Sequence, residues 1–183
     1  MSKPVALITG GGKRIGAAVS RKLMEMGYYV LIHVNSSVAE ASKIISDFST
    51  ANGNVECGDV VTGNLLIDSD VDNLIMSVIE HPAVKAANGL SGLIHNASIY
   101  DSIEIDEVTL ADLKKNLKLH VETPFKLTIG LMDLLKSSEG CIIGMVDTSL
   151  GRSWKGLSHY TSTKAGLRQL MINMAGDLSL IHI

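Results

Sequence analysis

The sequence predicts an α/β fold in which a doubly wound parallel sheet carries helices on both faces. Segments that favour strands alternate with segments of helical periodicity, and the strands are apolar along their whole length, as expected when both faces of a sheet are buried. A glycine-rich segment joins the first strand to the first helix. The pattern occupies residues 1–177 of 183, which we expect to form one domain.

The glycine-rich segment 9–16 follows an apolar strand predicted at 5–8 and leads into a helix predicted over 16–26. Glycines allow positive φ values and close approach of the backbone, and the free N–H groups at a helix start attract phosphate charge. A strand, a glycine turn and a helix in this order are typical of dinucleotide binding. Taken alone, the segment is equally compatible with an ordinary strand-to-helix turn.

The later elements follow in order. Further strands are predicted at 28–34, 55–60, 90–97 and 141–146, and further helices at 36–51, 68–79, 109–135 and 158–177. Ser36 has the character of a helix cap, residues 52–54 (Asn-Gly-Asn) predict a turn, and Pro82 ends or kinks the third helix. The long fourth helix is expected to be interrupted or bent near Pro124.

Ligands of such folds bind beyond the carboxyl ends of the strands. The residues that follow the predicted strands there are 10–16, 35–37, Asp59, 96–100 and 147–149. A functional site is therefore expected among them.

Composition excludes several classes of partner. Sixteen Lys plus Arg against 19 Asp plus Glu give a net charge of −3, which offers no field to gather nucleic acid or an anionic membrane. No apolar run is long enough to span a bilayer. Cys57 and Cys141 lie in apolar segments without metal-ligand spacing, so we expect buried, reduced thiols in a cytoplasmic protein. His95, His120 and His159 are expected to be structural, and no metal site is predicted.

The end of the second predicted strand carries no carboxylate that could accept the adenosine ribose hydroxyls of NAD. The strand ends in neutral residues from His33 to Ser37, and the Arg14 guanidinium could hold a 2′-phosphate by charge-assisted hydrogen bonds. NADP is therefore favoured over NAD. The alternative is that Arg14 is only a solvated cation and Ser36 only a cap.

Tyr160 and Lys164 are four residues apart, so both point from one face of the last predicted helix. A lysine ammonium near a phenol favours the phenolate, which is expected to lower the tyrosine pKa and make the hydroxyl a usable general acid. Such pairs also arise by chance on surface helices. The pair gains weight from its combination with the other segments.

In content and order, four segments resemble the short-chain dehydrogenase/reductase family: the glycine segment 9–16, Asp59, residues 95–98, and Tyr160 with Lys164. The resemblance covers about residues 5–177 and implies a Rossmann-like, NADP-dependent oxidoreductase. In that family the tyrosine transfers the proton, and the lysine binds the nicotinamide ribose and lowers the tyrosine pKa. The expected cofactor-binding residues are Gly10, Lys13, Arg14, Ile15, Gly16, His33, Asn35, Ser36, Ser37, Asp59, Val60, Asn96, Ala97, Ser98 and Lys164.

Three departures from the common family pattern resemble its pteridine reductase branch, including the bacterial dihydromonapterin reductases. Asp147 stands thirteen residues before Tyr160, where serine is usual; His120 stands where asparagine is usual; and residues 95–98 are His-Asn-Ala-Ser. In that branch, an aromatic residue at the position of Tyr100 clamps the pterin against the nicotinamide. The catalytic residues are then Tyr160, Lys164 and Asp147, and the substrate-binding residues are Ser98, Tyr100, Asp147 and Tyr160.

The resemblance thus implies an NADPH-dependent reductase that transfers hydride to the C=N bond of a pterin-like small molecule. Reduction of a ring nitrogen needs a proton, and a carboxyl beside a tyrosine can relay one from water. A carbonyl or 3-oxoacyl reductase of the same family and an inactive NADP-binding domain stay open as alternatives. The helices over 109–135 and 158–177 often form a dimer interface in the family, so a homo-oligomer is expected.

The carboxyl end carries two further expectations. Family members continue into additional strands and a substrate-closing loop, so we expect this chain to be truncated, to leave 142–146 as an edge strand, and to bind NADP poorly. Residues 178–183 (Leu-Ser-Leu-Ile-His-Ile) are what the mosaic end of a sequencing-library transposon encodes, which suggests a non-native tail. A genuine short strand is the alternative.

Overall fold

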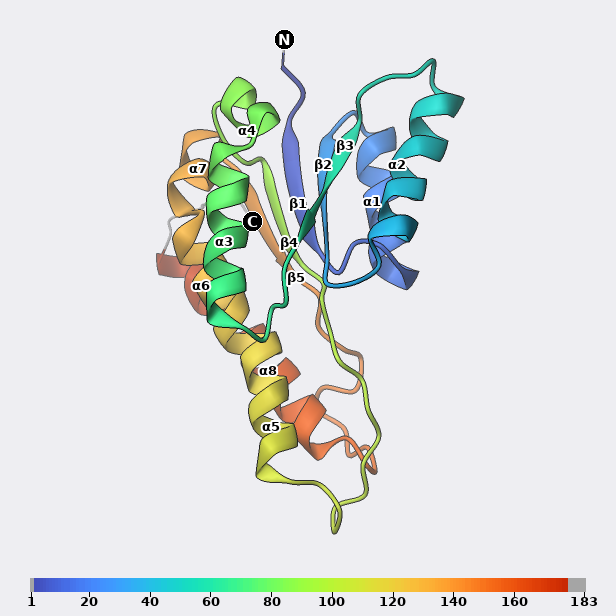
Figure 1. Ribbon diagram of the computed structural model, residues 1–183. Helices are drawn as coiled ribbons and strands as arrows, with labels where there is room; N and C mark the ends of the chain where they lie inside the picture. Colours follow the sequence, from blue (N-terminus) through green and yellow to red (C-terminus); the bar gives the residue numbers. More distant parts are fainter. Residues whose placement is uncertain (1, 178–183) are drawn as a thin grey trace.

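The computed structural model describes residues 2–177, so the predicted tail at 178–183 lies outside the described residues. Strands and helices alternate along the chain as predicted (Figure 1). The strands are β1 (Val5–Thr9), β2 (Tyr29–Val34), β3 (Gly58–Thr62), β4 (Gly92–His95) and β5 (Cys141–Gly144). The helices are α1 (Arg14–Glu25), α2 (Val38–Ala51), α3 (Asp68–Glu80), α4 (Pro82–Ala87), α5 (Leu110–Leu117), the π-helix η1 (Lys118–Glu122), α6 (Thr123–Gly130), α7 (Met132–Ser137) and α8 (Ser158–Asp177).

Within residues 2–177 the strands form one parallel sheet in the order β3-β2-β1-β4-β5. Helices α1 and α2 cover one face, and α3, α4, α6, α7 and α8 cover the other (Figure 1). The chain therefore reverses its winding direction between β1 and β4. This confirms the doubly wound fold, and the crevice at such a reversal is where these folds bind ligands.

A hydrophobic core lies on each face of the sheet. Alternate residues of β1 enter different cores, with Leu7 on the side of α3 and Ile8 on the side of α1. All five residues of this central strand are buried, as a parallel sheet covered on both faces requires. The two cores hold the carboxyl ends of the strands in a fixed position relative to the helices that follow them.

The third strand is displaced from its predicted position at 55–60. Val30 pairs with Gly58 in the parallel register, and a side chain at Gly58 would come within 2.4 Å of the Val30 carbonyl oxygen. Close backbone packing at Gly58 thus sets the register, and Val55 is left exposed before the strand. The carboxyl end of β3 moves from Val60 to Thr62.

The predicted helix over 109–135 is divided into four helical pieces. Pro124 has no N–H group to donate to the carbonyl of His120, and the preceding Thr123 N–H bonds instead to Lys118, five residues back. This spacing is that of a π-helix, which often marks a functional site. His120 lies buried within it.

The two cysteines differ in exposure. Cys57 is buried as predicted, whereas Cys141 is exposed because it begins β5 at the edge of the sheet described here. Both thiols are free, and no group of metal-binding side chains occurs among residues 2–177. None of the described helices is long and apolar enough to cross a membrane.

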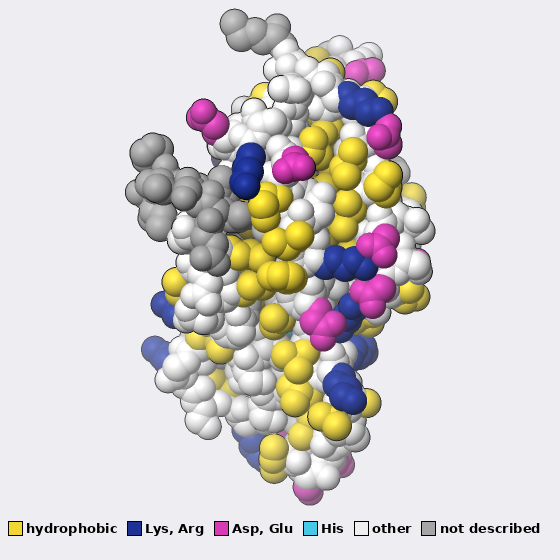
Figure 2. All heavy atoms as spheres, turned by 90° about the vertical axis from the view of Figure 1, so that its left-hand side faces the viewer, with side chains coloured by type: hydrophobic (Ala, Val, Ile, Leu, Met, Phe, Trp, Pro, Cys, Tyr) yellow, Lys and Arg dark blue, Asp and Glu magenta, His cyan; other side chains and the backbone are white. Residues whose placement is uncertain are grey.

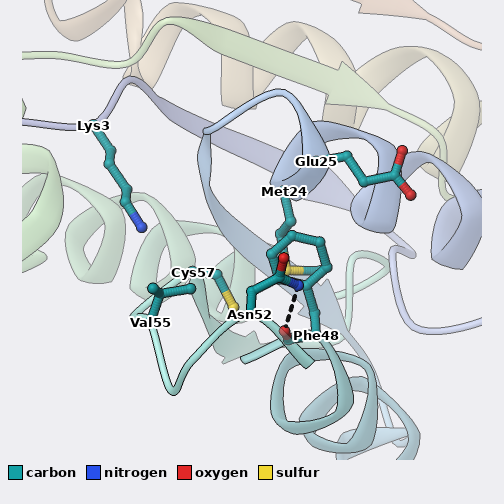
Figure 3. A pocket seen from close by; sticks show the side chains of 7 residues that line it. All are labelled: Lys3, Met24, Glu25, Phe48, Asn52, Val55 and Cys57. Carbon is teal, nitrogen blue, oxygen red and sulfur yellow. Dashed lines mark hydrogen bonds between the residues drawn. The ribbon is translucent and has the colours of Figure 1, made fainter. Parts of the chain in front are cut away.

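An open cavity of about 650 Å³ lies at the amino ends of the strands (Figure 3). It is lined by Lys3, Met24, Glu25, Phe48, Asn52, Val55 and Cys57. These residues precede β1 and β3 or end α1 and α2. The cavity is therefore at the opposite end of the sheet from the site expected at the carboxyl ends.

Candidate active site

The glycine segment folds tightly over the end of β1. The N–H of Gly11 donates to the carbonyl of His33 at 3.0 Å, and the Ser20 hydroxyl donates to the carbonyl of Gly11 at 3.1 Å. A side chain at Gly16 would come within 2.2 Å of the Gly10 carbonyl oxygen. Glycine is required here because the first turn of α1 packs directly on the loop.

The start of α1 is suited to an anion. Among the described residues, no side chain caps this helix at Lys13, and its first turn contains no acidic residue. Its first N–H groups and the positive end of its dipole are consequently available to a ligand. Arg14 is exposed and has a φ of +49°, whereas Lys13 forms an exposed ion pair with Glu40 at 2.8 Å.

His33 connects the glycine segment to the end of β3. Its Nδ1 accepts a hydrogen bond from the N–H of Gly10 at 3.4 Å, and its Nε2 lies 3.0 Å from the carbonyl oxygen of Gly63, to which it donates. Burial lowers the pKa of the imidazole, which keeps the ring neutral. His33 is therefore a buried support of the loop, and Asn35 and Ser36 are the residues exposed beyond the strand.

The prediction that Asp59 lies just beyond the third strand is wrong, and Val60, predicted as the last residue of that strand, lies in its middle. Asp59 pairs with Leu31 within the sheet, and its carboxylate lies 3.4 Å from Nε2 of His81, at the start of α4. The displaced register of β3 is the cause. The residues beyond this strand are Asn64 and Leu65, which the sequence analysis missed although Gly63-Asn64 marks the break before α3. Asn64 is held by its N–H, which donates to Asp70 at 2.9 Å.

Asn96 links the end of β4 to the glycine segment. Its side-chain amide donates to the carbonyls of Thr9 at 2.9 Å and Gly10 at 3.1 Å, and the Thr9 hydroxyl oxygen accepts the N–H of Ala97 at 3.1 Å. These bonds place the two segments that flank the reversal of the sheet against each other. Ser98 is exposed beyond them.

Tyr160, Asp147 and Lys164 come together although they arise from two elements. The Tyr160 hydroxyl donates to Oδ2 of Asp147 at 2.8 Å, and Oδ1 of Asp147 accepts the N–H of Ser149 at 2.8 Å. The Lys164 ammonium donates to the carbonyl of Met145 at 2.8 Å and lies 5.9 Å from the centre of the Tyr160 ring. The loop after β5 and the first turns of α8 thus form one polar cluster.

The pKa shifts in this cluster differ from the sequence-based expectation for Tyr160. Burial and the bond to the Asp147 carboxylate raise the tyrosine pKa, because both disfavour the phenolate. The hydrogen bond from the Ser149 N–H holds the pKa of Asp147 below its usual range, and burial lowers the pKa of Lys164 to about 8. In this state, Tyr160 is a neutral donor to an ionised carboxylate. Lys164 does not lower the pKa of Tyr160.

Two further rings surround Tyr160. The centre of the Tyr100 ring is 5.0 Å from that of Tyr160 at an interplanar angle of 80°, and the His120 ring is 5.6 Å away at 85°. Tyr100 is 57% exposed, so one of its faces is open to a ligand. The predicted substrate residues Ser98, Tyr100, Asp147 and Tyr160 therefore belong to one region at the carboxyl end of the sheet.

The buried ammonium of Lys164 leads to a prediction on stability. An unfolded lysine titrates near pH 10.4, above the value of about 8 in the folded protein, so the unfolded chain binds more protons between these values. We expect the free energy of unfolding to rise from about pH 8 to about pH 10. Lys164→Met is expected to remove this rise and to stabilise the protein at pH 7 by roughly 1–3 kcal/mol. Urea unfolding across this pH range measures both effects, and equal slopes in the two proteins would contradict the prediction.

The family model described as short chain dehydrogenase matches residues 4–183. An uncharacterized oxidoreductase of Thermotoga maritima is 24% identical over 98% of this chain and 67% of its own length. A dihydromonapterin reductase of Enterobacter sp. is 26% identical over 94% of this chain and 68% of that protein. The solved structure of FolM alternative dihydrofolate reductase 1 from Brucella suis, in complex with NADP, has a TM-score of 0.82 at 25% identity and covers 97% of this chain and 68% of its own.

The chain therefore spans about two thirds of the length of these proteins. The family match extends over nearly the whole chain and agrees with the strand order, the glycine segment and the tyrosine–lysine pair of α8. The chain belongs to the short-chain dehydrogenase family.

Proposed function

We propose that this protein is an NADPH-dependent reductase that transfers hydride to the C=N bond of a pterin-like substrate. The observation that carries the proposal is the 2.8 Å hydrogen bond between Tyr160 and Asp147 beside the open face of Tyr100. An aromatic ring suits a flat heterocycle, and a carboxylate joined to a phenol suits proton delivery to a ring nitrogen. The likeness to a dihydromonapterin reductase and to FolM supports this substrate class.

The residues present fit a dinucleotide phosphate. The uncapped start of α1 offers N–H groups and a positive dipole, and the loop below it has no side chains at residues 10–12 to block a pyrophosphate. The chain beyond β2 is neutral from Asn35 to Ser37, and Arg14, the first residue of α1, is exposed. This set favours NADP over NAD, and the FolM structure was solved with NADP.

The proton is handled by groups of this chain. Bound NADPH would supply the hydride from its nicotinamide ring. Tyr160 is positioned to donate its proton to a substrate nitrogen, and Asp147 is partly exposed and can pass a replacement proton from water to the phenolate that forms. Lys164, charged at neutral pH, would hold the nicotinamide ribose.

Arg14 provides a test of the choice of cofactor. Arg14→Gly is expected to weaken NADPH binding roughly 10- to 100-fold, the value of a charge-assisted hydrogen bond, and to leave NADH binding within about twofold. Because glycine readily adopts the φ of +49° found at this position, the variant should be at least as stable as the wild type. Fluorescence titration with each cofactor measures the ratio of the NADPH and NADH dissociation constants. Lys22→Gln is the matched control, since Lys22 is an exposed cation farther along the same helix that pairs with Glu25, and equal losses for both cofactors would contradict the role of Arg14.

The reaction itself is tested by following NADPH oxidation by the protein with three substrates: a dihydropterin, a simple ketone and a 3-oxoacyl thioester. Turnover with the dihydropterin alone is the expected result. Turnover with only the carbonyl compounds would overturn the proposal in favour of a carbonyl reductase. Cofactor binding without turnover of any substrate would indicate an NADP-binding domain that has lost its activity.

A carbonyl reductase is the second candidate because of Ser98. The hydroxyl of Ser98 acts on Tyr160 in the direction opposite to Asp147 and lowers the tyrosine pKa. It could therefore steady a carbonyl oxygen in place of the serine that the family usually has at position 147. The three-substrate assay separates this candidate from the first.

We further propose that the protein is a cytoplasmic homo-oligomer. Hydrophobic side chains gather on the side that carries α3, α6 and α7 (Figure 2), and Phe125 and Ile129 of α6 are about half exposed. On the last helix, Met174 is buried in the core and Ile172 is exposed. Sedimentation of the wild type and of Phe125→Glu tests the assembly, and the variant is expected to sediment as a smaller species. The cytoplasmic location is supported by the two free thiols, which agree with a reducing compartment.

A further inference from the structure

His120 connects three segments that surround Tyr160. Its Nε2 lies 3.0 Å from the Ser98 hydroxyl and accepts the N–H of Ile99 at 3.3 Å. Its Nδ1 lies 2.9 Å from the hydroxyl of Thr163, on α8. The imidazole is 1% exposed, and it comes from the π-helix η1, which places it between the loop after β4 and α8.

The hydrogen-bond partners determine which nitrogen carries the proton. The Thr163 hydroxyl donates its hydrogen to the Tyr160 carbonyl at 2.8 Å, so toward His120 it can only accept. Nδ1 must therefore be the protonated nitrogen. The Ile99 N–H independently requires Nε2 to be an acceptor. A cationic imidazole would place a second N–H against that of Ile99, and both burial and the charge of Lys164 lower the His120 pKa to about 3.

We propose that His120, held in the neutral form protonated at Nδ1, is a positioning residue that fixes the loop of Ser98, Ile99 and Tyr100 to α8. It sets the Tyr100 ring relative to the Tyr160 hydroxyl through the contacts of Nε2 with Ser98 and Ile99 and the bond from Nδ1 to Thr163. Asparagine, the usual residue here in the family, has a shorter side chain and cannot reach both. The kinetic part of this inference rests on the proposed pterin function, whereas the protonation state and the bonds do not.

Two substitutions separate the contacts of Nε2 with the loop from the bond of Nδ1 to Thr163. The amide oxygen of His120→Gln can take the place of Nε2 and keep the loop, whereas the amide of His120→Asn can take the place of Nδ1 and keep only the bond to Thr163. We expect KM for the dihydropterin to stay within about threefold in the Gln variant and to rise roughly 5- to 20-fold in the Asn variant. That rise corresponds to the loss of one or two hydrogen bonds. The value of kcat should change less than KM in both variants.

A control variant distinguishes a specific change in KM from one caused by lower overall stability. His81→Gln alters a partly buried histidine whose Nδ1 accepts the N–H of Ala83 at 3.2 Å, at the opposite end of the sheet. It should lower the melting temperature without changing KM. A purely structural His120 would instead give the Gln and Asn variants equal KM values, or KM losses that merely follow their melting temperatures, and this would overturn the proposal.

The protonation state is measured without substrate. In ¹⁵N-labelled protein at pH 7, the side-chain ¹⁵N shifts of His120 should show a proton on Nδ1 and none on Nε2, and the pattern should persist to about pH 5. A proton on Nε2, or an imidazolium at pH 7, would overturn the inference whatever the substrate proves to be. If the ¹⁵N shifts agree with this pattern but no dihydropterin is turned over, the proposed function fails. The assigned protonation state of His120 and its bonds to the loop and to Thr163 are then still supported.

Discussion

Replacing Tyr160 by phenylalanine is expected to lower kcat for the dihydropterin by roughly 10²- to 10⁴-fold, the usual contribution of a positioned general acid. The phenol is the only group of this cluster that both donates a proton in the described structure and faces the Tyr100 ring. Phenylalanine keeps the ring contacts with Tyr100 and His120, so the loop and the buried core around the ring should stay in place. Steady-state kinetics with saturating NADPH measure the loss.

Fluorescence titration with NADPH provides the control for this substitution. Phenylalanine removes no N–H group of the glycine segment and no charge near α1, so the dissociation constant of NADPH should stay within about threefold of that of the wild type. Retention of wild-type kcat in a variant that still binds NADPH would show that another group delivers the proton. Loss of NADPH binding together with kcat would leave the catalytic role unsupported and assign Tyr160 to cofactor binding instead.

The elements that the sequence predicts best are those in which local chemistry and the global fold agree. The segment from Val5 to Glu25 was predicted as strand, glycine turn and helix, because glycine packing and apolar periodicity are both local properties. The start of α8 was likewise predicted at Ser158, which places Tyr160 and Lys164 on one face. Such short-range patterns need no knowledge of the partner strand.

The errors arise where tertiary pairing decides. The segment 55–62 is compatible with several strand positions, and only the fit of Gly58 against the backbone of Val30 selects one. Asp59 was consequently placed at the wrong end of its strand. The π-helix around His120 also escaped prediction, because the missing N–H of Pro124 indicates a disturbance but does not say how the helix absorbs it.

For the pKa of Tyr160, too, the local spacing could be predicted from the sequence, whereas the effect of tertiary contacts could not. The spacing of Tyr160 and Lys164 was sufficient to predict their proximity, and the sign of the lysine's effect followed from its charge. The burial of the phenol and its bond to Asp147 reverse the outcome in this state, and neither can be obtained from spacing.

Replacing Asp147 by asparagine is accordingly expected to have two measurable effects with one cause. Without the carboxylate charge, the phenolate of Tyr160 is less disfavoured, so the tyrosine pKa should fall below its wild-type value while burial keeps it raised. At the same time, the amide cannot pass a proton from water to the phenolate, and kcat for the dihydropterin should fall roughly 10²-fold or more. Phenolate absorbance across an alkaline titration and steady-state kinetics measure the two effects separately.

Asp147→Ser distinguishes a proton relay from simple charge removal. Serine supplies a hydroxyl that can steady a carbonyl oxygen, so this variant should lose dihydropterin turnover as the asparagine variant does, yet gain activity toward ketones relative to it. A shift of the kcat/KM ratio between ketone and dihydropterin by roughly tenfold or more would fit the loss of a relay worth 10²-fold or more. If both variants keep wild-type dihydropterin turnover while the tyrosine pKa falls, the carboxylate only tunes Tyr160 and does not carry its proton.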